Sequence, residues 1–261
     1  MRVILTGGTG FLGKYLTESL LSKGLEILAL VRSKEKIEFI KSDNLSVQEF
    51  EIGKNHTLPE DISRRFDSIV HLAWSNVNDV NLKEHIDSYM PAHFNFLEKI
   101  IRSGIKNVFV IGTCYEYGMC EGSIDENHQT KPITNYGIAK KELSQKLLNL
   151  QKTIDFNLTW ARLFYVYGKG QVSSTIYSQL NNALKRGDRN FKMSNGDQLL
   201  DYLSINEVTE IFTKLIIREK LDLGYINICK GEPIKLEELV KKWIDESSRE
   251  ITLELGVYPY R

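Results

Sequence analysis

The sequence has few cysteines and no surplus of charge of either sign. Its 261 residues include three cysteines, and its 34 basic side chains are matched by 34 acidic ones. The cysteines are scattered and odd in number, which does not suit a disulfide framework, and since no CxxC or paired Cys/His spacing occurs, no metal site is expected. Without a basic surplus, neither nucleic acid nor an anionic membrane is expected as a partner.

Long hydrophobic runs are also missing. No stretch approaches the roughly 18 apolar residues that a membrane span needs, and the N-terminal MRVILTGG lacks the apolar core of a signal peptide. We therefore expect a soluble protein of the cytoplasm, a reducing compartment. With 42% hydrophobic and 26% charged residues, the composition is that of a globular chain that can bury a sizeable core.

The sequence does contain short apolar runs that alternate with amphipathic stretches. The runs predicted as buried strands cover residues 2–6, 26–31, 47–52, 68–72, 107–112 and 159–164. Stretches of helical period separate them, clearest at 93–103 and 136–150. Strands that alternate with helices imply βαβ units and a parallel sheet covered on both faces. After residue 166 glycines interrupt the pattern, so we expect a first domain over 1–166 and a smaller lobe over 167–261.

Three glycines spaced three residues apart mark the junction between the first predicted strand and the helix that follows. Gly7, Gly10 and Gly13 occur in the segment TGGTGFLG. The first allows a tight turn, the second lets a pyrophosphate approach the backbone, and the third lets the helix pack closely on the strand. The helix N-terminus adds free N–H groups and a partial positive charge. The pattern therefore predicts dinucleotide binding by an α/β fold, a Rossmann-type doubly wound parallel sheet. The lobe expected over 167–261 would then be a smaller C-terminal substrate-binding lobe.

Four further motifs follow the glycine loop. They are HLAW at 71–74, GTCYEYG at 112–118, YGIAK at 136–140 and RLFYVYG at 162–168. Together they resemble the extended branch of the short-chain dehydrogenase/reductase superfamily, the NAD-dependent epimerase/dehydratase family. The stretches FKMSNGDQLLDYLSI, INICKGEPI and LELGVYPYR are similar to bacterial 4-keto-6-deoxy nucleotide-sugar C4 reductases.

The resemblance implies three catalytic residues. Thr113 would hydrogen-bond the substrate oxygen that undergoes redox chemistry, Tyr136 would transfer its proton, and Lys140 would hold the cofactor ribose. Tyr136 and Lys140 share one helix face at this spacing. Because an unperturbed tyrosine has a pKa of about 10, a nearby ammonium is needed to lower it toward neutral pH. The alternative for Thr113 is a residue that merely ends a strand.

The resemblance also implies a nicotinamide cofactor site. Its expected residues are Gly7, Thr9, Gly10, Phe11, Leu12, Gly13, Arg32, Ser33, Glu51, Ile52, Leu72, Ala73, Trp74, Tyr136 and Lys140. After the second strand, at VRSK, no acid is present to bind the ribose hydroxyls of NAD, whereas Arg32 could pair with a 2′-phosphate and Ser33 could add a hydrogen bond. We therefore expect NADP(H) rather than NAD(H). The alternative is that Arg32 stacks on adenine or lies in solvent.

The expected partner is a nucleotide sugar. Residues expected to contact it are Trp74, Thr113, Cys114, Tyr165, Arg189, Lys192 and Arg261. Two positions depart from the family pattern: Leu200 stands where an arginine usually meets the diphosphate, and Tyr165 replaces an asparagine. Trp74 has packing in the core as an alternative role.

Three reactions of the family compete. Dehydratases carry an Asp-Glu pair directly after the catalytic threonine, but here Cys114 and Tyr115 follow, which disfavours dehydration. NADPH-dependent reduction of a C4 keto group on a dTDP-, CDP- or GDP-linked 4-keto-6-deoxy sugar, for bacterial surface polysaccharide, is favoured by the basic Arg32 loop. A C4 epimerase with retained NAD stays open, as does a non-catalytic NADP sensor or scaffold.

Assembly is expected from analogy with the family. The helices at 93–103 and 136–150 would form a four-helix bundle in a homodimer, although the same apolar faces would serve a monomer's core. The sequence ends in PYR without a capping element, which leaves room for a further C-terminal segment.

Overall fold

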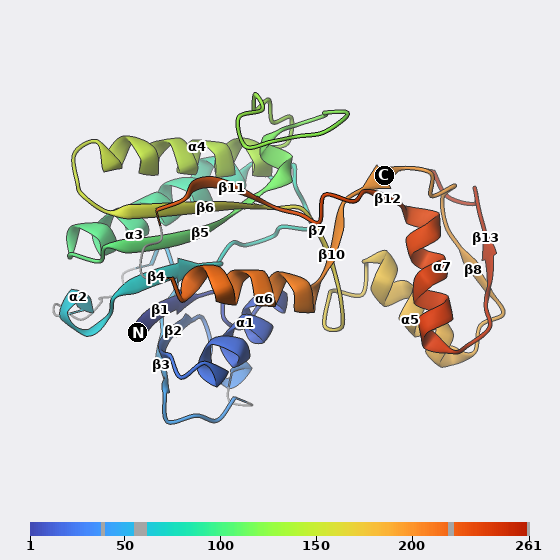
Figure 1. The fold of residues 1–261 in the computed structure, drawn as a ribbon, viewed down its shortest axis with the longest axis horizontal. Coiled ribbons are helices and arrows are strands. Elements are labelled where there is room, and N and C mark those ends of the chain that lie inside the picture. The colour runs from blue at the N-terminus through green and yellow to red at the C-terminus, as the bar shows by residue number, and fades with distance from the viewer. Residues whose placement is uncertain (38–39, 55–61, 219–221, 260–261) are drawn as a thin grey trace. The chain divides into compact units, whose positions relative to one another are not determined.

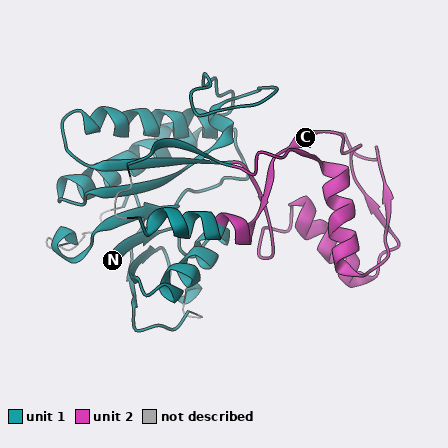
Figure 2. Cartoon of the chain, in the orientation of Figure 1, with its two compact units in different colours: residues 1–163, 209–228 teal, residues 164–208, 229–261 magenta. Residues whose placement is uncertain are grey.

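The computed structural model describes residues 1–37, 40–54, 62–218 and 222–259. The chain divides into two compact units (Figure 2): unit 1 contains residues 1–163 and 209–228, and unit 2 contains residues 164–208 and 229–261. Among the described residues, no helix is both long and apolar enough to cross a membrane.

A parallel sheet forms the centre of unit 1 (Figure 1), and within the described residues it has seven strands. In spatial order they are β11 (Gly224–Ile228), β6 (Asn157–Leu163), β5 (Asn107–Thr113), β4 (Ser68–His71), β1 (Arg2–Thr6), β2 (Glu26–Val31) and β3 (Leu45–Glu49). The chain order reverses between β1 and β4, which is where doubly wound sheets bind ligands at the carboxyl ends of their strands. The predicted Rossmann-type fold is confirmed.

Helices cover both faces of this sheet. They are α1 (Phe11–Ser22), α2 (Ile62–Arg65), α3 (Met90–Arg102), α4 (Asn135–Gln151) and the part of α6 (Ile205–Ile216) that belongs to unit 1, with short helical turns at Lys34–Lys36, His85–Tyr89 and Cys114–Glu116. Side chains alternate between the two faces along each strand. Val108 and Val110 of β5 join the core beneath α3 and α4, whereas Phe109 contacts Phe212 of α6 with ring centroids 5.1 Å apart.

The boundary between the units differs from the predicted division at residue 166. The chain returns to unit 1 over residues 209–228 instead of forming one continuous C-terminal lobe. Two contacts explain the return: α6 buries Phe212 against β5, and β11 pairs with β6 along its whole length. The third strand also lies earlier than predicted, because Ile27 to Val31 pair with Leu45 to Glu49.

Unit 2 is built from much shorter strands. Within the described part of this unit they form three pairs: β7 (Tyr165–Tyr167) with β10 (Tyr202–Ser204), β8 (Asn190–Lys192) with β13 (Thr252–Glu254), and β9 (Leu199–Leu200) with β12 (Ile234–Lys235). Its helices α5 (Ile176–Arg186) and α7 (Leu236–Ser247) pack through Leu180, Leu184, Val240 and Trp243. The unit therefore holds its own small hydrophobic core.

Candidate active site

The glycine loop between β1 and α1 has the tight geometry that the sequence predicts. Gly7 has a φ of 76°, and a Cβ there would lie 2.7 Å from the Ala73 nitrogen. A Cβ on Gly13 would lie 2.0 Å from the Gly7 carbonyl oxygen, so any side chain would push the helix off the loop. The first turn of α1 has no acidic residue and no side-chain cap, so its N–H groups are available to an anion.

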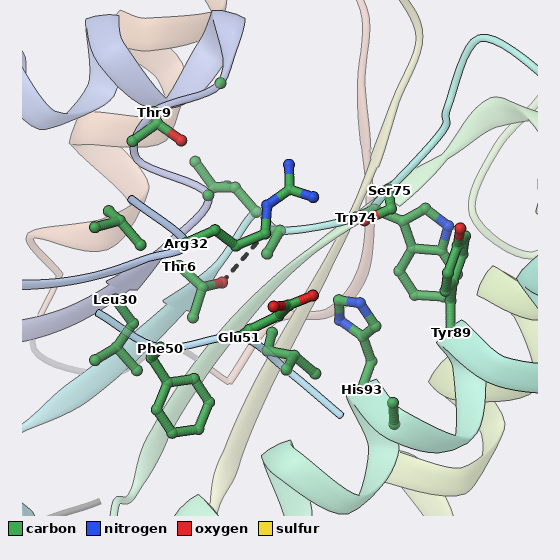
Figure 3. A pocket seen from close by; sticks show the side chains of 17 residues that line it. Thr6, Thr9, Leu30, Arg32, Phe50, Glu51, Trp74, Ser75, Tyr89 and His93 are labelled. Atoms are coloured by element: carbon green, nitrogen blue, oxygen red, sulfur yellow. Dashed lines mark hydrogen bonds between the residues drawn. The ribbon is translucent and has the colours of Figure 1, made fainter. Parts of the chain in front are cut away.

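A pocket of about 230 Å³ opens beside this loop (Figure 3). Nine of the residues predicted to bind a cofactor line it: Gly7, Thr9, Gly10, Arg32, Glu51, Ile52, Leu72, Ala73 and Trp74. Figure 3 shows Arg32 and Glu51 extending into the middle of the opening, with Trp74, Tyr89 and His93 together at one side. The carboxyl ends of β1, β2 and β4 thus bring together segments that are far apart in sequence.

Six predicted cofactor residues do not line the pocket: Phe11, Leu12, Gly13, Ser33, Tyr136 and Lys140. Phe11, Leu12 and Gly13 lie in the first turn of α1, where Gly13 packs against the Gly7 carbonyl. The Ser33 hydroxyl donates a hydrogen bond to Glu35 Oε2 at 3.1 Å instead of facing the pocket.

The pocket also contains residues that sequence reasoning missed. Thr6, Leu30, Phe50, Tyr89, Ala92 and His93 are among its lining residues. His93 Nδ1 lies 2.8 Å from Nε2 of His71, and His71 Nδ1 lies 2.9 Å from the Thr6 hydroxyl. Burial and, to a smaller extent, the Lys140 charge lower the pKa of His93 to about 3, and burial together with His93 holds the pKa of His71 well below its usual value. Both imidazoles are therefore neutral near pH 7.

The three predicted catalytic residues meet at the end of β5 and the start of α4. The side chains of Thr113 and Tyr136 are hydrogen-bonded to each other. One helical turn further on, Lys140 Nζ is fully buried and has no hydrogen-bond partner among the described residues. It lies 4.5 Å from the Trp74 ring centre and 5.2 Å from that of Trp160.

Burial dominates the electrostatics of this group. It lowers the pKa of Lys140 to about 7, against the opposing effect of the Glu116 charge. Burial also raises the pKa of Tyr136, with Glu116 and Cys114 raising it further and the Thr113 hydrogen bond opposing them. Lys140 is not among the groups that lower the pKa of Tyr136, because a desolvated lysine with a pKa of about 7 carries no charge at the pH where a tyrosine titrates. Tyr136 keeps its proton, as a proton donor should.

These features fit a nicotinamide cofactor. The buried Nζ of Lys140 has N–H donors that ribose hydroxyls would satisfy, and the glycine loop leaves room for a pyrophosphate. A positively charged oxidised nicotinamide near Tyr136 would also lower the tyrosine's pKa.

Trp74 connects the pocket with the catalytic tyrosine. Its indole N–H donates to His85 Nδ1 at 3.0 Å, and His85 Nε2 in turn lies 2.8 Å from the Asp79 carbonyl oxygen. The indole stacks on the His93 ring with ring centroids 4.6 Å apart. It also makes a T-shaped contact with the Tyr136 ring, with centroids 6.1 Å apart. Trp74 is therefore held in one orientation between both parts of the site.

The predicted substrate residues are divided between the units. Trp74, Thr113 and Cys114 lie together in unit 1, where Cys114 begins the helical turn after β5. In unit 2, Tyr165 packs on Tyr202 with centroids 5.4 Å apart, and Lys192 Nζ lies 4.0 Å from Glu254 Oε2.

Two further residues, Arg189 and Arg261, were predicted to contact the substrate. Arg189 precedes β8, where its carbonyl oxygen accepts from Thr252 at 2.9 Å, and Arg261 lies outside the described residues. Among the residues that the structure does describe, no cluster of three or more His, Cys, Asp or Glu is arranged to hold a metal ion.

Comparison with known proteins gives the same assignment as the fold and the site. The model of the NAD dependent epimerase/dehydratase family matches residues 3–229, most of the sequence. The chain belongs to this family. The predicted membership of the extended short-chain dehydrogenase/reductase superfamily is confirmed, and the chain is an oxidoreductase of that type.

Two relatives come from Aggregatibacter actinomycetemcomitans. A dTDP-6-deoxy-L-talose 4-dehydrogenase (NAD(+)) is 30% identical over 267 residues, which cover 100% of this chain and 96% of the relative. A GDP-6-deoxy-D-talose 4-dehydrogenase is 26% identical and covers 88% of this chain and 75% of the relative. Both relatives are named for redox chemistry at the same carbon of a nucleotide-linked 6-deoxy sugar.

Solved structures share the fold. A UDP-glucuronic acid 4-epimerase from Bacillus cereus, in complex with UDP-glucuronic acid and NAD, has a TM-score of 0.82 at 18% identity and covers 98% of this chain and 86% of its own. MoeE5 in complex with UDP-glucuronic acid and NAD has a TM-score of 0.79 at 22% identity, with coverage of 98% and 85%. At these identities the likeness establishes the fold alone.

Proposed function

We propose that this protein carries out redox chemistry at C4 of a nucleotide-linked sugar, and specifically reduces the C4 keto group of a dTDP-, CDP- or GDP-linked 4-keto-6-deoxy sugar with NADPH. The observation that carries the proposal is the hydrogen-bonded pair of Thr113 and Tyr136, beside which Lys140 Nζ is buried and has no hydrogen-bond partner in the part of the chain that the structure describes. The names of the two talose 4-dehydrogenases support the position of the chemistry. We also propose that the protein is a cytoplasmic homodimer and that it acts in surface-polysaccharide synthesis.

The three catalytic side chains have separate roles. Thr113 donates its hydroxyl proton to the keto oxygen and so holds the C4 carbonyl beside Tyr136. Tyr136, which is protonated near pH 7, gives its proton to the developing alkoxide. Lys140 holds the ribose hydroxyls of the cofactor, which supplies the reducing equivalent when bound. Trp74 closes one side of the pocket and excludes water from Tyr136.

The preference for NADPH rests on Arg32. Its side chain lines the pocket, and no ion pair with another described residue engages its guanidinium. A free planar guanidinium suits a 2′-phosphate. Ser33 adds nothing to this argument, because its hydroxyl is bonded to Glu35. The name of one relative specifies NAD(+), so the preference requires its own measurement.

Dehydration is disfavoured by the residues around Thr113. Cys114 and Tyr115 offer no carboxylate for the elimination of water. The nearest carboxylate in the chain, Glu116, is fully buried and accepts hydrogen bonds from Thr113, Trp160 and Arg162. A carboxylate held in this way is not available as an acid or a base.

The proposal is tested by mixing the purified protein with NADPH and a panel of dTDP-, CDP- and GDP-linked 4-keto-6-deoxy sugars. Loss of nicotinamide absorbance in proportion to one sugar is the expected result, and it would identify the nucleotide. A sugar isomer formed with retained cofactor and no net oxidation would instead establish an epimerase. NADPH binding without turnover of any sugar would favour a sensor.

A further inference from the structure

A buried ion pair lies directly behind the proposed catalytic threonine. Glu116 is fully buried, and Arg162 is 3% exposed. Glu116 Oε2 accepts a hydrogen bond from Arg162 Nε at 2.9 Å, while Oε1 accepts from the Trp160 indole N–H, also at 2.9 Å. The proposed reaction gives neither charged residue a chemical role.

The second acceptor bond of Glu116 Oε1 reaches the catalytic residue itself. Oε1 accepts from the Thr113 backbone N–H at 2.9 Å, and the Thr113 hydroxyl oxygen accepts from the Tyr115 N–H at 3.3 Å. These reciprocal bonds form a capping box at the turn that follows β5. The box fixes the main chain of Thr113, and therefore the direction in which its hydroxyl meets Tyr136.

The surroundings of the pair are built to keep the carboxylate in place. The Arg162 guanidinium lies 4.7 Å from the Tyr117 ring centre and 4.1 Å from that of Tyr225, and Nη1 donates to the Tyr117 hydroxyl at 2.9 Å. Gly112 leaves the necessary space, because a Cβ there would lie 2.7 Å from Glu116 Oε1.

A buried ion pair is weak evidence of a stabilising role, since apolar residues of similar volume often replace such pairs without loss of stability. A capping bond to Thr113, by contrast, needs an acceptor at this place. We propose that Glu116 is a positioning residue of the active site, whose carboxylate holds the Thr113 main chain and presents its negative charge to Tyr136 and Lys140. This inference rests on the proposed role of Thr113.

The first test is a double-mutant cycle between Glu116→Gln and Thr113→Val. Glutamine keeps one side-chain oxygen but replaces the other with an NH2 group, which cannot accept a hydrogen bond. Whichever way the amide is turned, the hydrogen bond from either Arg162 or Thr113 is therefore lost. We expect Glu116→Gln to lower kcat roughly 10-fold in the wild-type background, with cofactor affinity unchanged. In the Thr113→Val background the same change should lower kcat by less than about two-fold, because the group that Glu116 positions is already gone. Losses that multiply would overturn the proposal.

Glu116→Asp provides a second route through the same cycle if the glutamine variant does not fold. It keeps the charge and withdraws the carboxylate by one methylene, and the same coupling with Thr113→Val is expected. Glu121→Gln, an exposed change in the same region of sequence, is the matched control and should leave kcat unchanged. The cycle works with any turnover that Thr113 supports, oxidation included, so failure of the keto-sugar assay would not be mistaken for failure of the cycle.

A second measurement requires no substrate. Among the described residues, Glu116, His71 and His93 interact electrostatically with Lys140, and Tyr136 lies one turn before it on the same helix. Because the Glu116 charge raises the pKa of Lys140, Glu116→Gln should move the titration of the Lys140 side chain to lower pH. Carbon-13 NMR of labelled lysines would follow it, with Lys140→Met identifying the signal. An unchanged Lys140 titration would contradict the electrostatic part of the proposal.

Discussion

The two units differ in how their predicted functional residues are held. In unit 1, strands of four to seven residues run in parallel, and their carboxyl ends bring the glycine loop, Arg32, Trp74 and Thr113 to one edge of the sheet. In unit 2 the strands have two or three residues, and Tyr165 and Lys192 lie in different strand pairs. Sequence motifs therefore predict the geometry of a site where long parallel strands hold it, but they do not predict it where the strands are short and paired in twos.

The sharpest test of this difference is Tyr136→Phe in unit 1. Removing the proton donor should lower kcat by about 10³-fold while cofactor affinity stays the same. Steady-state kinetics with cofactor titration by fluorescence would measure both. Tyr115→Phe is the matched control, since its ring lies 6.2 Å from that of Tyr136 but its hydroxyl makes no bond to Thr113. Turnover within a few-fold of wild type in Tyr136→Phe would refute the assignment.

The loss of folding stability in acid should also arise in unit 1, because every histidine of the sequence lies within residues 1–163. His93 is neutral in the folded protein, so below pH 6.5 the unfolded chain binds more protons and stability falls. With a folded pKa of about 3, His93 should account for about 2 kcal/mol of lost unfolding free energy between pH 6.5 and pH 5.

Urea unfolding at these two pH values would measure this loss. His93→Gln should flatten the pH dependence, and the exposed His128→Gln should not. The same slope in both variants would show that the buried pair of imidazoles does not cause the acid sensitivity.

A smaller effect is expected at Arg32. Arg32→Gln should reduce the ratio of kcat/KM for NADPH to that for NADH by about 10-fold, since it removes one charge-assisted hydrogen bond to a 2′-phosphate. Lys34→Gln, two positions further along the same exposed segment, should leave the ratio nearly unchanged. A ratio insensitive to Arg32 would mean that this side chain stacks on adenine or lies in solvent.

The smallest effects should come from unit 2. Arg189→Ala or Lys192→Ala should raise KM for the nucleotide sugar about five-fold and leave cofactor affinity unchanged, because an exposed cation contributes little to binding a diphosphate. Lys241→Ala, which removes the partner of Glu237 on α7, is the control within the same unit. No change in KM for either variant would leave the predicted contacts of unit 2 without support.

Local patterns were enough to predict the parallel sheet apart from β11, and nine of the residues that line the pocket. The strand, glycine loop and helix are contiguous in sequence, and YGIAK places Tyr136 and Lys140 on one helix face. The Thr-x-x-Glu spacing of Thr113 and Glu116 also carried a capping-box signal that could have revealed the buried carboxylate.

What could not be predicted depends on contacts between distant residues. The hydrogen bond between His71 and His93 joins a strand to a helix 22 residues away, and no local period marks it. β11 joins the sheet because it pairs with β6, more than 60 residues earlier in the chain. The position of β3 follows from its register with β2, so Glu51 and Ile52 lie beyond the strand and still line the pocket.

Reduction at C4 of a nucleotide sugar can be tested directly by measuring the transfer of deuterium from the cofactor to the sugar. The protein would be given NADPH deuterated at C4 of the nicotinamide ring, together with the keto sugar that it consumes, and the product would be examined by NMR. Reduction at C4 should place one deuterium at sugar C4 for each cofactor oxidised. Deuterium at another carbon, or an isomerised and unlabelled sugar with the cofactor unchanged, would contradict it.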